Sequence, residues 1–319
     1  MYVLGFDIGG TKCAVSACNV EGNDIIISEK KVFKTNTTIP CDEMIKEFYP
    51  TIKDYIERYG CKSIGISCGG PLDSNKGVIV APPNLPNFIN FPIVDVLKTE
   101  FKIPVFLQND ANACALAEWI FGAGKGTQNM AFLTFGTGLG SGLILNGKLY
   151  DGTNGNAGEV GHIRLSNDGP IGYGKRGSFE GFCSGGGLAQ LGEMYAKEAL
   201  KRGETPAYYN PDDKGCITAK SIAIAAENGD STAIEVYKNC GKYLGFGLSM
   251  LIDILNPEKI VIGSIFARSK HLLWDECLKE LKEEALDVSF DVCDVVPAQL
   301  GENLGDVAAA TVAVYGMRG

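Results

Sequence analysis

Over the first sixty positions, the apolar residues change from clusters typical of β-strands to a spacing typical of a helix. Strand-like runs cover residues 2–7, 12–20 and 25–34, and glycine-containing links of the hairpin type connect them. From residue 41 to 59 the apolar residues recur at helical spacing, and Gly60 stands where a helix would end. This segment therefore predicts three strands followed by one helix.

The alternation of strands and helices continues along the chain and begins a second cycle near residue 129. The expected order is strands 63–68 and 105–108, helix 113–121, strands 131–134 and 141–146, helices 187–202, 218–227 and 230–256, strand 259–262, helix 269–285, strand 291–298 and an Ala-rich helix 305–315. This order predicts an α/β fold. We expect two lobes, namely residues 1–112 with about 300–319, and residues 113–299. The Gly-rich stretch 150–187 has few periodic apolar positions and is expected to carry a site.

The composition is that of a globular protein and argues against several classes of function. Of the 319 residues, 45% are hydrophobic and 21% are charged, and the length suits two domains. The net charge of −9 and the lack of a basic run argue against nucleic-acid binding. No apolar stretch is long enough to span a membrane, and no signal peptide is visible. With eleven cysteines and no CxxC pair, we expect a cytoplasmic protein with reduced, mostly buried thiols.

The 41 glycines gather in short clusters, and the first cluster follows the first strand. There, Asp7 is followed by Gly9, Gly10, Thr11 and Lys12. Glycines expose backbone N–H groups, the hydroxyl and the ammonium add donors, and the carboxylate can face a hydrated Mg²⁺ ion. The run therefore suits phosphates and magnesium, although a bare Gly-Gly pair is by itself more typical of an ordinary hairpin turn.

A second glycine loop, residues 134–142, occupies a similar place in the second half of the chain. It contains Thr137 and Gly138, carries no charge, and suits an anion better than it suits solvent. Two such loops favour one phosphate chain held between the lobes over a pair of structural turns. Neither a Walker A sequence nor a strict GxGxxG fingerprint is present.

Asn109 and Asp110 follow a predicted strand and precede a predicted helix, where α/β proteins place ligands. Taken alone, Asp110 is most simply a helix N-cap. Together with two phosphate loops, it is better interpreted as a general base that takes a proton from a sugar hydroxyl. In the Gly-rich stretch, Glu159, His162 and Glu180 are suited to bind further sugar hydroxyls, although a lone histidine is usually structural.

Four ordered motifs resemble those of the ROK family (repressors, open reading frames and kinases): Asp7–Lys12, Asn109–Asn112, Gly136–Gly140 and Glu159–His162. The resemblance covers nearly the whole chain, through residues 304–310. It implies an actin-like ATPase fold with two ribonuclease H-like lobes and a cleft between them that closes around ATP and a hexose. It also implies Asp110 as the base, Mg²⁺ held by Asp7 through water, and a homodimer formed through the second lobe.

The resemblance assigns further residues to each substrate. On the sugar side it implies Gly70, Asn84, Asn109, Asp110, Glu159, His162 and Glu180. On the nucleotide side it implies Asp7, Gly9, Gly10, Thr11, Lys12, Thr137, Gly138 and, beside the adenosine, Gly263. The family usually has another glycine where Ser264 stands in this chain.

One departure from the family concerns zinc. Many members carry a Cys-x-Cys-Gly-x-x-Gly-Cys-x-Glu motif, and alignment on Glu180 puts Ile171, Tyr173 and Ser178 at its cysteine positions. A structural zinc site needs about four ligands, usually Cys and His. We therefore expect no zinc, and expect packing of Ile171, Tyr173 and Phe179 to hold the loop instead.

The activity that the resemblance implies is ATP-dependent phosphorylation of a hexose. Glucose, at its 6-hydroxyl, is the first expectation, with N-acetylmannosamine, fructose, allose and β-glucosides as alternatives, and polyphosphate stays open as a donor. A sugar-responsive repressor would carry a helix-turn-helix domain that has no counterpart before Asp7. A noncatalytic sugar-binding protein would be expected to lack Asp7 or Asp110, and both are present.

Overall fold

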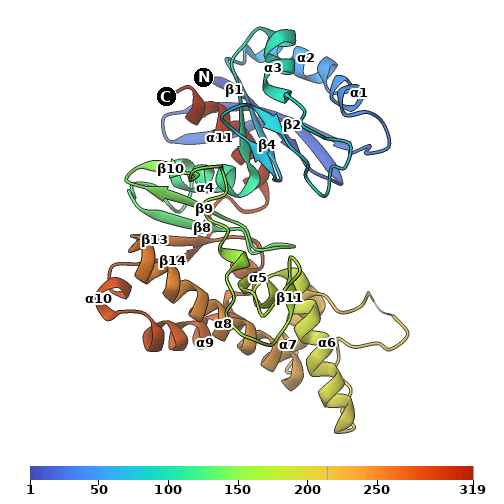
Figure 1. The fold of residues 1–319 in the computed structure, drawn as a ribbon, viewed down its shortest axis with the longest axis vertical. Coiled ribbons are helices and arrows are strands. Elements are labelled where there is room, and N and C mark those ends of the chain that lie inside the picture. The colour runs from blue at the N-terminus through green and yellow to red at the C-terminus, as the bar shows by residue number, and fades with distance from the viewer. Residues whose placement is uncertain (214, 319) are drawn as a thin grey trace. The chain divides into compact units, whose positions relative to one another are not determined.

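The computed structural model describes residues 1–213 and 215–318, which form a mixed α/β fold with two five-stranded sheets and two small two-stranded ones (Figure 1). Contacts divide the chain into two compact units. Unit 1 comprises Met1–Gln128, Gly142–Ala157 and Gln299–Gly319, and unit 2 comprises Asn129–Ser141 and Gly158–Ala298. None of the helices in the described ranges is long and apolar enough to cross a membrane.

The elements of unit 1 come from both ends of the chain. In order they are β1 Tyr2–Ile8, β2 Lys12–Glu21, β3 Asp24–Lys34, α1 Cys41–Lys46, α2 Tyr49–Tyr59, β4 Ile64–Cys68, β5 Leu72–Asp73, β6 Val78–Ile79, α3 Ile93–Phe101, β7 Val105–Asn109, α4 Asp110–Phe121, β9 Ser141–Leu145, β10 Lys148–Tyr150, η2 Gly301–Asn303 and α11 Leu304–Gly316. The main sheet has the order β3-β2-β1-β4-β7. Its first three strands are antiparallel, whereas β1, β4 and β7 run parallel.

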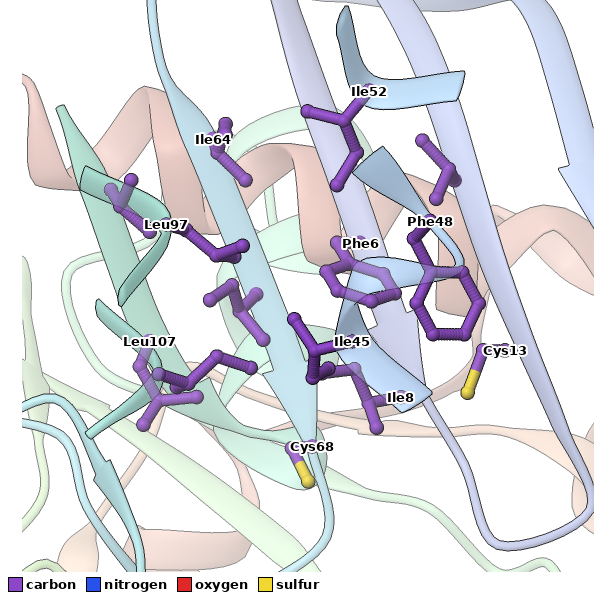
Figure 2. Packing of buried hydrophobic residues seen from close by; sticks show 14 of the residues in the cluster. Phe6, Ile8, Cys13, Ile45, Phe48, Ile52, Ile64, Cys68, Leu97 and Leu107 are labelled. Carbon is purple, nitrogen blue, oxygen red and sulfur yellow. The ribbon is translucent and has the colours of Figure 1, made fainter. Parts of the chain in front are cut away.

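Alternation along β1 assigns each face of this sheet to a different set of helices. Leu4, Phe6 and Ile8 join the core beneath α1 and α2, where the Phe6 and Phe48 rings lie 4.9 Å apart (Figure 2). Val3, on the opposite face, packs with residues of α4 and α11. By the same alternation, Asp7 near the end of β1 lies on the α4–α11 face.

Helix α11 lies so close to the sheet that glycine is required beneath it. A Cβ on Gly5 would lie 2.8 Å from the Ala310 nitrogen, and a Cβ on Gly65 would lie 2.1 Å from the Ala309 oxygen. Any side chain at either position would push the helix away. This backbone contact brings the first residues of α11 to the end of β1.

The whole of helix α4 belongs to unit 1, whereas the sequence predicted that the first lobe would end at residue 112, within this helix. The reason is that Ala113, Ala117 and Phe121 pack in one core with α11. The buried carboxylate of Glu118 then fixes the following turn and the returning chain, since it accepts hydrogen bonds from the amides of Ala123 (2.8 Å), Gln299 (3.1 Å) and Leu300 (2.8 Å).

Unit 2 combines parallel strands with a helical layer. Its elements are β8 Met130–Leu133, η1 Val160–His162, β11 Ile171–Gly172, β12 Lys175–Arg176, α5 Phe179–Phe182, α6 Gly185–Lys201, α7 Ala219–Glu227, α8 Ser231–Leu255, β13 Lys259–Ile262, α9 Ser264–Glu284, α10 Asp287–Phe290 and β14 Asp294–Pro297. Strand β13 pairs in parallel with β8 and β14. Helices α8 and α9 approach closely at Gly241 and Gly245, whose Cβ atoms would meet the Leu273 and Cys277 carbonyls.

Most predicted elements are confirmed, and the exceptions have physical causes. The helix expected over 41–59 is two helices, because Pro50 at the start of α2 has no N–H to donate to an earlier carbonyl. It ends at Gly60 as expected, in the left-handed conformation (φ 66°). The strand expected over 291–298 is shorter, Asp294–Pro297, and follows the short helix α10. Helix α9 begins five residues before the predicted start, and a residue inside it, Ser269, departs from helical backbone angles (φ −123°).

The cysteines are distributed as the composition suggests. All eleven are free, and eight of them are buried. Burial raises the pKa of most of these thiols, for example that of Cys61 to about 11. These buried thiols are therefore protonated and unreactive at neutral pH.

Candidate active site

In unit 1, three carboxylates lie near one another where β1, α4 and α11 begin or end. Asp7 is half-buried and pairs in register with Ser67 of β4. Burial, followed by the charges of Asp306 and Asp110, raises the pKa of Asp7 to about 7, while Lys12 and a hydrogen bond from Ser67 oppose the shift. Asp7 is therefore only partly ionised at neutral pH, and a nearby cation would favour its charged form.

Asp306 belongs to this cluster and was not among the predicted site residues. It is buried and pairs with Lys30, whose Nζ lies 2.5 Å from Oδ2. At the neighbouring residue, a Cβ on Gly305 would lie 3.6 Å from Asp7 Oδ2. The only available signal was the Gly305-Asp306 pair within the final motif of the family resemblance, which carried no assigned role.

Asp110 is the first residue of α4, and the N-cap is its neighbour Asn109, whose Oδ1 accepts from the Ala111 amide at 3.0 Å. Asp110 reaches solvent, yet the protein around its carboxylate raises the pKa of Asp110 through partial desolvation. Hydrogen bonds from the amides of Ala111 and of Asp110 itself oppose that shift. An accessible carboxylate with a raised pKa has the properties of a general base.

Asp7 and Asp110 share the same surroundings. After burial, the largest influences that raise the pKa of the Cys68 thiol are Asp110 and then Asp7, and the same two carboxylates act on Cys114. A Cβ on Gly69 would lie 3.8 Å from Asp110 Oδ2. The structure therefore places the predicted metal-side and base carboxylates of unit 1 within electrostatic range of each other.

A network of amides fixes the segment that carries Asp110. The side-chain oxygen of Gln108 accepts from the Asn109 amide at 2.7 Å and from Asn112 Nδ2 at 3.3 Å. Gly70 lies against this segment, since its Cβ would be 3.4 Å from Asn109 Nδ2. Gly70 and Asn109, both predicted on the sugar side, are thus neighbours of Asp110. Gln108 and Asn112 are supporting residues that the sequence did not single out.

The first glycine turn is a tight hairpin, and it also presents donors. The Gly9 amide donates to the Lys12 carbonyl at 3.1 Å, and Thr35 Oγ1 donates to the Gly9 carbonyl at 2.6 Å. Thr11 and Lys12 remain exposed. Asn84 lies directly against the turn, because a Cβ on Gly10 would be 2.6 Å from the Asn84 carbonyl oxygen.

The second glycine loop, in unit 2, is held largely by its own hydrogen bonds. The Thr134 amide donates to the Gly140 carbonyl, the Gly136 amide to the Gly138 carbonyl, and the Gly140 amide to Thr134 Oγ1, each at 2.9 Å. Thr137 at its tip is exposed. Because these amides are used within the loop, fewer of them can bind an anion than a count of glycines suggests.

The start of α6 and the end of β13 support the same loop. The amides of Gly185 and Gly186 donate to the carbonyls of Gly136 (2.8 Å) and Thr137 (3.3 Å). Gly263 is buried, and its Cβ would lie 3.4 Å from the Thr134 carbonyl oxygen. The predicted nucleotide residues Thr137, Gly138 and Gly263 are therefore brought together in unit 2.

The predicted sugar residues of unit 2 lie on short, neighbouring segments. Glu159 precedes η1 and His162 is its last residue, and both are exposed, whereas Glu180 in α5 is half-buried. Lys175 Nζ donates to the His162 carbonyl at 2.7 Å, and the Tyr173 ring lies edge-on to the imidazole with 6.4 Å between the ring centres.

The expected packing of Ile171, Tyr173 and Phe179 is wrong for two of the three residues. Phe179 is buried, but Ile171 and Tyr173 are 43% and 79% exposed. Hydrogen bonds hold the loop instead. Gln190 pairs with both backbone groups of Ile171, at 2.9 and 2.8 Å, and the buried Ser178 hydroxyl caps α5.

The donor atoms of the site suit magnesium better than zinc. Within the described ranges, no three His, Cys, Asp or Glu side chains are grouped to hold a metal ion. Mg²⁺ needs only one or two protein carboxylates, because waters and substrate phosphates complete its shell. Asp7 with the hydroxyl of Ser67 beside it fits that requirement. The absence of zinc stays a prediction.

The ROK family model matches residues 3–314. This chain belongs to the ROK family. A curated glucokinase from Halalkalibacterium halodurans is 32% identical over 314 residues, which cover 95% of this chain and 92% of the relative. The family match confirms the predicted α/β fold of the actin-like ATPase type and identifies the chain as a sugar phosphotransferase.

Two solved structures extend the comparison. The ROK glucokinase of Streptomyces griseus in complex with glucose and AMPPNP has a TM-score of 0.78 and 28% identity, covering 99% of this chain and 100% of the other. A ROK transcriptional regulator, homologous to the E. coli MLC protein, has a TM-score of 0.83 and 25% identity, covering 98% of this chain but 77% of the regulator. The fold is thus shared by both classes of the family.

Proposed function

We propose that this ROK protein transfers the γ-phosphoryl group of ATP to the 6-hydroxyl of glucose, with Asp110 as the general base. The observation that carries the proposal is the state of Asp110, an accessible carboxylate whose pKa is raised by its surroundings. A carboxylate so placed can take the proton of a sugar hydroxyl as that oxygen attacks phosphorus. The glucose and AMPPNP bound to the Streptomyces griseus relative support this choice of substrates.

The remaining residues of unit 1 serve the phosphates and the orientation of the sugar. Asp7 would hold Mg²⁺ through water, and the bound ion supplies neutralisation of phosphate charge. Thr11 and Lys12, exposed on the first glycine turn, add a hydroxyl and an ammonium as donors. Gly70, Asn84 and Asn109 would line the sugar, and Asn109 also fixes the start of the helix that carries the base.

The predicted site residues of unit 2 also form two sets, one for the sugar and one for the nucleotide. Glu159, His162 and Glu180 would bind sugar hydroxyls, while Thr137, Gly138 and Gly263 would bind the nucleotide. Phosphoryl transfer depends mainly on positioning and charge neutralisation, so such a distributed set of residues is what the reaction needs. A homodimer and a cytoplasmic location remain predictions.

The test is an assay of ADP release with glucose, N-acetylmannosamine, fructose, allose and cellobiose in parallel, and with ATP and polyphosphate as donors. We expect the highest kcat/KM with glucose and ATP. Asp110→Asn should lower kcat by about 10²–10⁴-fold, because it removes the proton acceptor. Asp73→Asn, which alters a carboxylate paired with Lys76 near the surface, is the matched control and should leave kcat unchanged.

Since the base must be ionised, activity should fall on the acid side of the pH profile, at a pH above the ordinary carboxyl range. No turnover of any sugar, or full turnover by Asp110→Asn, would contradict the proposal. A higher kcat/KM with one of the other sugars would retain the mechanism and correct the substrate.

A further inference from the structure

Glu180, which is predicted to bind sugar, also makes a contact within the protein that sugar binding alone would not require. Its Oε2 accepts a hydrogen bond from the Leu139 amide of the second glycine loop at 3.0 Å. Leu139 is buried, so its backbone has little freedom to find another partner. A carboxylate predicted to bind sugar therefore also holds the backbone of a loop predicted to bind phosphate.

Glycines from three separate segments make room for Glu180. A Cβ on Gly138 in the loop would lie 2.7 Å from Glu180 Oε2, and a Cβ on Gly172 in β11 would lie 2.8 Å from Glu180 Cβ. At Gly161 in η1 the corresponding distance is 3.4 Å. The loop, the segment that bears Glu159 and His162, and the 171–176 hairpin thus meet around one side chain.

The chemistry of a carboxylate allows it to serve two partners at once. Its two oxygens offer about four acceptor positions, so an amide and a sugar hydroxyl can donate to it together. An ionised acceptor also forms a stronger bond with a backbone amide than a neutral acceptor does. The bond to Leu139 can therefore fix the loop whether or not sugar is present.

We propose that Glu180 is a positioning residue for the glycine loop, and that through this bond it prepares unit 2 to bind the phosphates of a nucleotide. This inference rests on the proposed kinase function and deepens it. Glu180 then contributes to nucleotide affinity even in the absence of sugar. A residue that only bound sugar would have no such effect.

The test measures binding of Mg²⁺–AMPPNP by calorimetry without sugar. Glu180→Ala should weaken the affinity about tenfold, because the Leu139 amide loses its partner. Glu180→Gln should stay within about threefold of the wild type, because its amide oxygen can still accept. Glu193→Ala, which removes a carboxylate from an exposed ion pair on α6, is the matched control and should bind as the wild type does.

Hydrogen exchange at the Leu139 amide gives a second readout that does not depend on nucleotide. It should be faster in Glu180→Ala and nearly unchanged in Glu180→Gln. Because the glutamine variant keeps the size of the side chain, it keeps the test informative if the alanine variant folds poorly.

Two results would count against the inference in distinguishable ways. If the wild type binds Mg²⁺–AMPPNP and Glu180→Ala binds it equally well, with only the KM for sugar raised, Glu180 is a sugar ligand alone. If the wild type binds no nucleotide and phosphorylates no sugar, the proposed function fails and this inference fails with it. If hydrogen exchange at the Leu139 amide were unchanged in Glu180→Ala, Glu180 would not hold the backbone of the loop, and the inference would be wrong.

Discussion

The two glycine loops look alike in the sequence but are built differently. The first, Gly9–Lys12, is a short hairpin turn beside Asp7, and it leaves Thr11 and Lys12 exposed. The second, residues 134–142, uses several of its amides internally and is held by Glu180 and the start of α6. The first loop thus presents charges and donors, whereas the second presents a fixed shape. Substitutions should separate the two roles.

Among substitutions at the two loops, the largest effect is expected from Asp7→Asn, which removes a carboxylate beside the first loop. Its kcat should fall by about 10²–10³-fold, because the proposed Mg²⁺ ion would lose the carboxylate that holds it. The measurement is steady-state kinetics as a function of Mg²⁺ concentration. Activity equal to the wild type at all Mg²⁺ concentrations would exclude Asp7 from the metal site.

The same substitution should make the protein more stable at high pH. The fold raises the pKa of Asp7 from its ordinary value of 3.8 to about 7, so ionisation of Asp7 destabilises the fold increasingly as the pH rises from about 4 to 7. Asp7→Asn should therefore raise the free energy of unfolding by on the order of 2 kcal/mol at pH 8, and by almost nothing at pH 4. Urea unfolding at both pH values measures the difference, and an equal effect at both would contradict it.

A smaller difference, in the free energy of unfolding, is expected when one glycine of each loop is replaced by alanine. Gly10→Ala would drive a methyl group into the Asn84 backbone, whereas Gly138→Ala would meet the movable end of the Glu180 side chain. We expect Gly10→Ala to lower the free energy of unfolding by about 1–3 kcal/mol, and Gly138→Ala by less than about 1 kcal/mol. Gly138→Ala should instead weaken nucleotide binding. Thermal unfolding and calorimetry distinguish the two, and equal losses of stability would break the contrast.

The smallest effect concerns Ser264, which adjoins the second loop. Its φ of 49° is in the left-handed region, and a Cβ on Gly136 would lie 3.6 Å from its hydroxyl. Ser264→Gly should raise the free energy of unfolding by up to about 1 kcal/mol, because glycine adopts that conformation without strain. Ser249→Gly, within α8, should lower the stability by a similar amount. A loss of stability in Ser264→Gly would show that its side chain has a role that the backbone angle does not reveal.

Local signals in the sequence predicted the elements well where many residues share one pattern. The strands of unit 1 and the long helices of unit 2 follow from runs of apolar residues. Helix α3 was missed although Ile93, Leu97 and Phe101 recur at helical spacing, because the run is only nine residues long. The break in the helix expected over 41–59 was missed because its apolar spacing continues through Pro50.

Prediction of the candidate site was limited by contacts between distant parts of the chain. The sequence indicated Asp7 and Asp110, but the link of Asp306 to Lys30 joins positions at opposite ends of the chain. The exposure of Ile171 and Tyr173 was equally hidden, because Gln190 rather than an apolar partner fixes that hairpin. The apolar and aromatic side chains of Ile171 and Tyr173 suggested that they would pack in the interior. Their exposure became evident only from the structure, where Gln190 holds the backbone of Ile171.

The contact of α11 with Gly5 and Gly65 has a consequence for synthesis of the protein on the ribosome. A nascent chain that has reached residue 298 already contains all five strands of the first sheet and α4, but it still lacks α11, which packs directly on one face of that sheet. Val3 and Cys18 on that face then lack their partners from α11 until residues 304–316 have been made. Completion of unit 1 must therefore wait until the segments of unit 2 that interrupt it have been made.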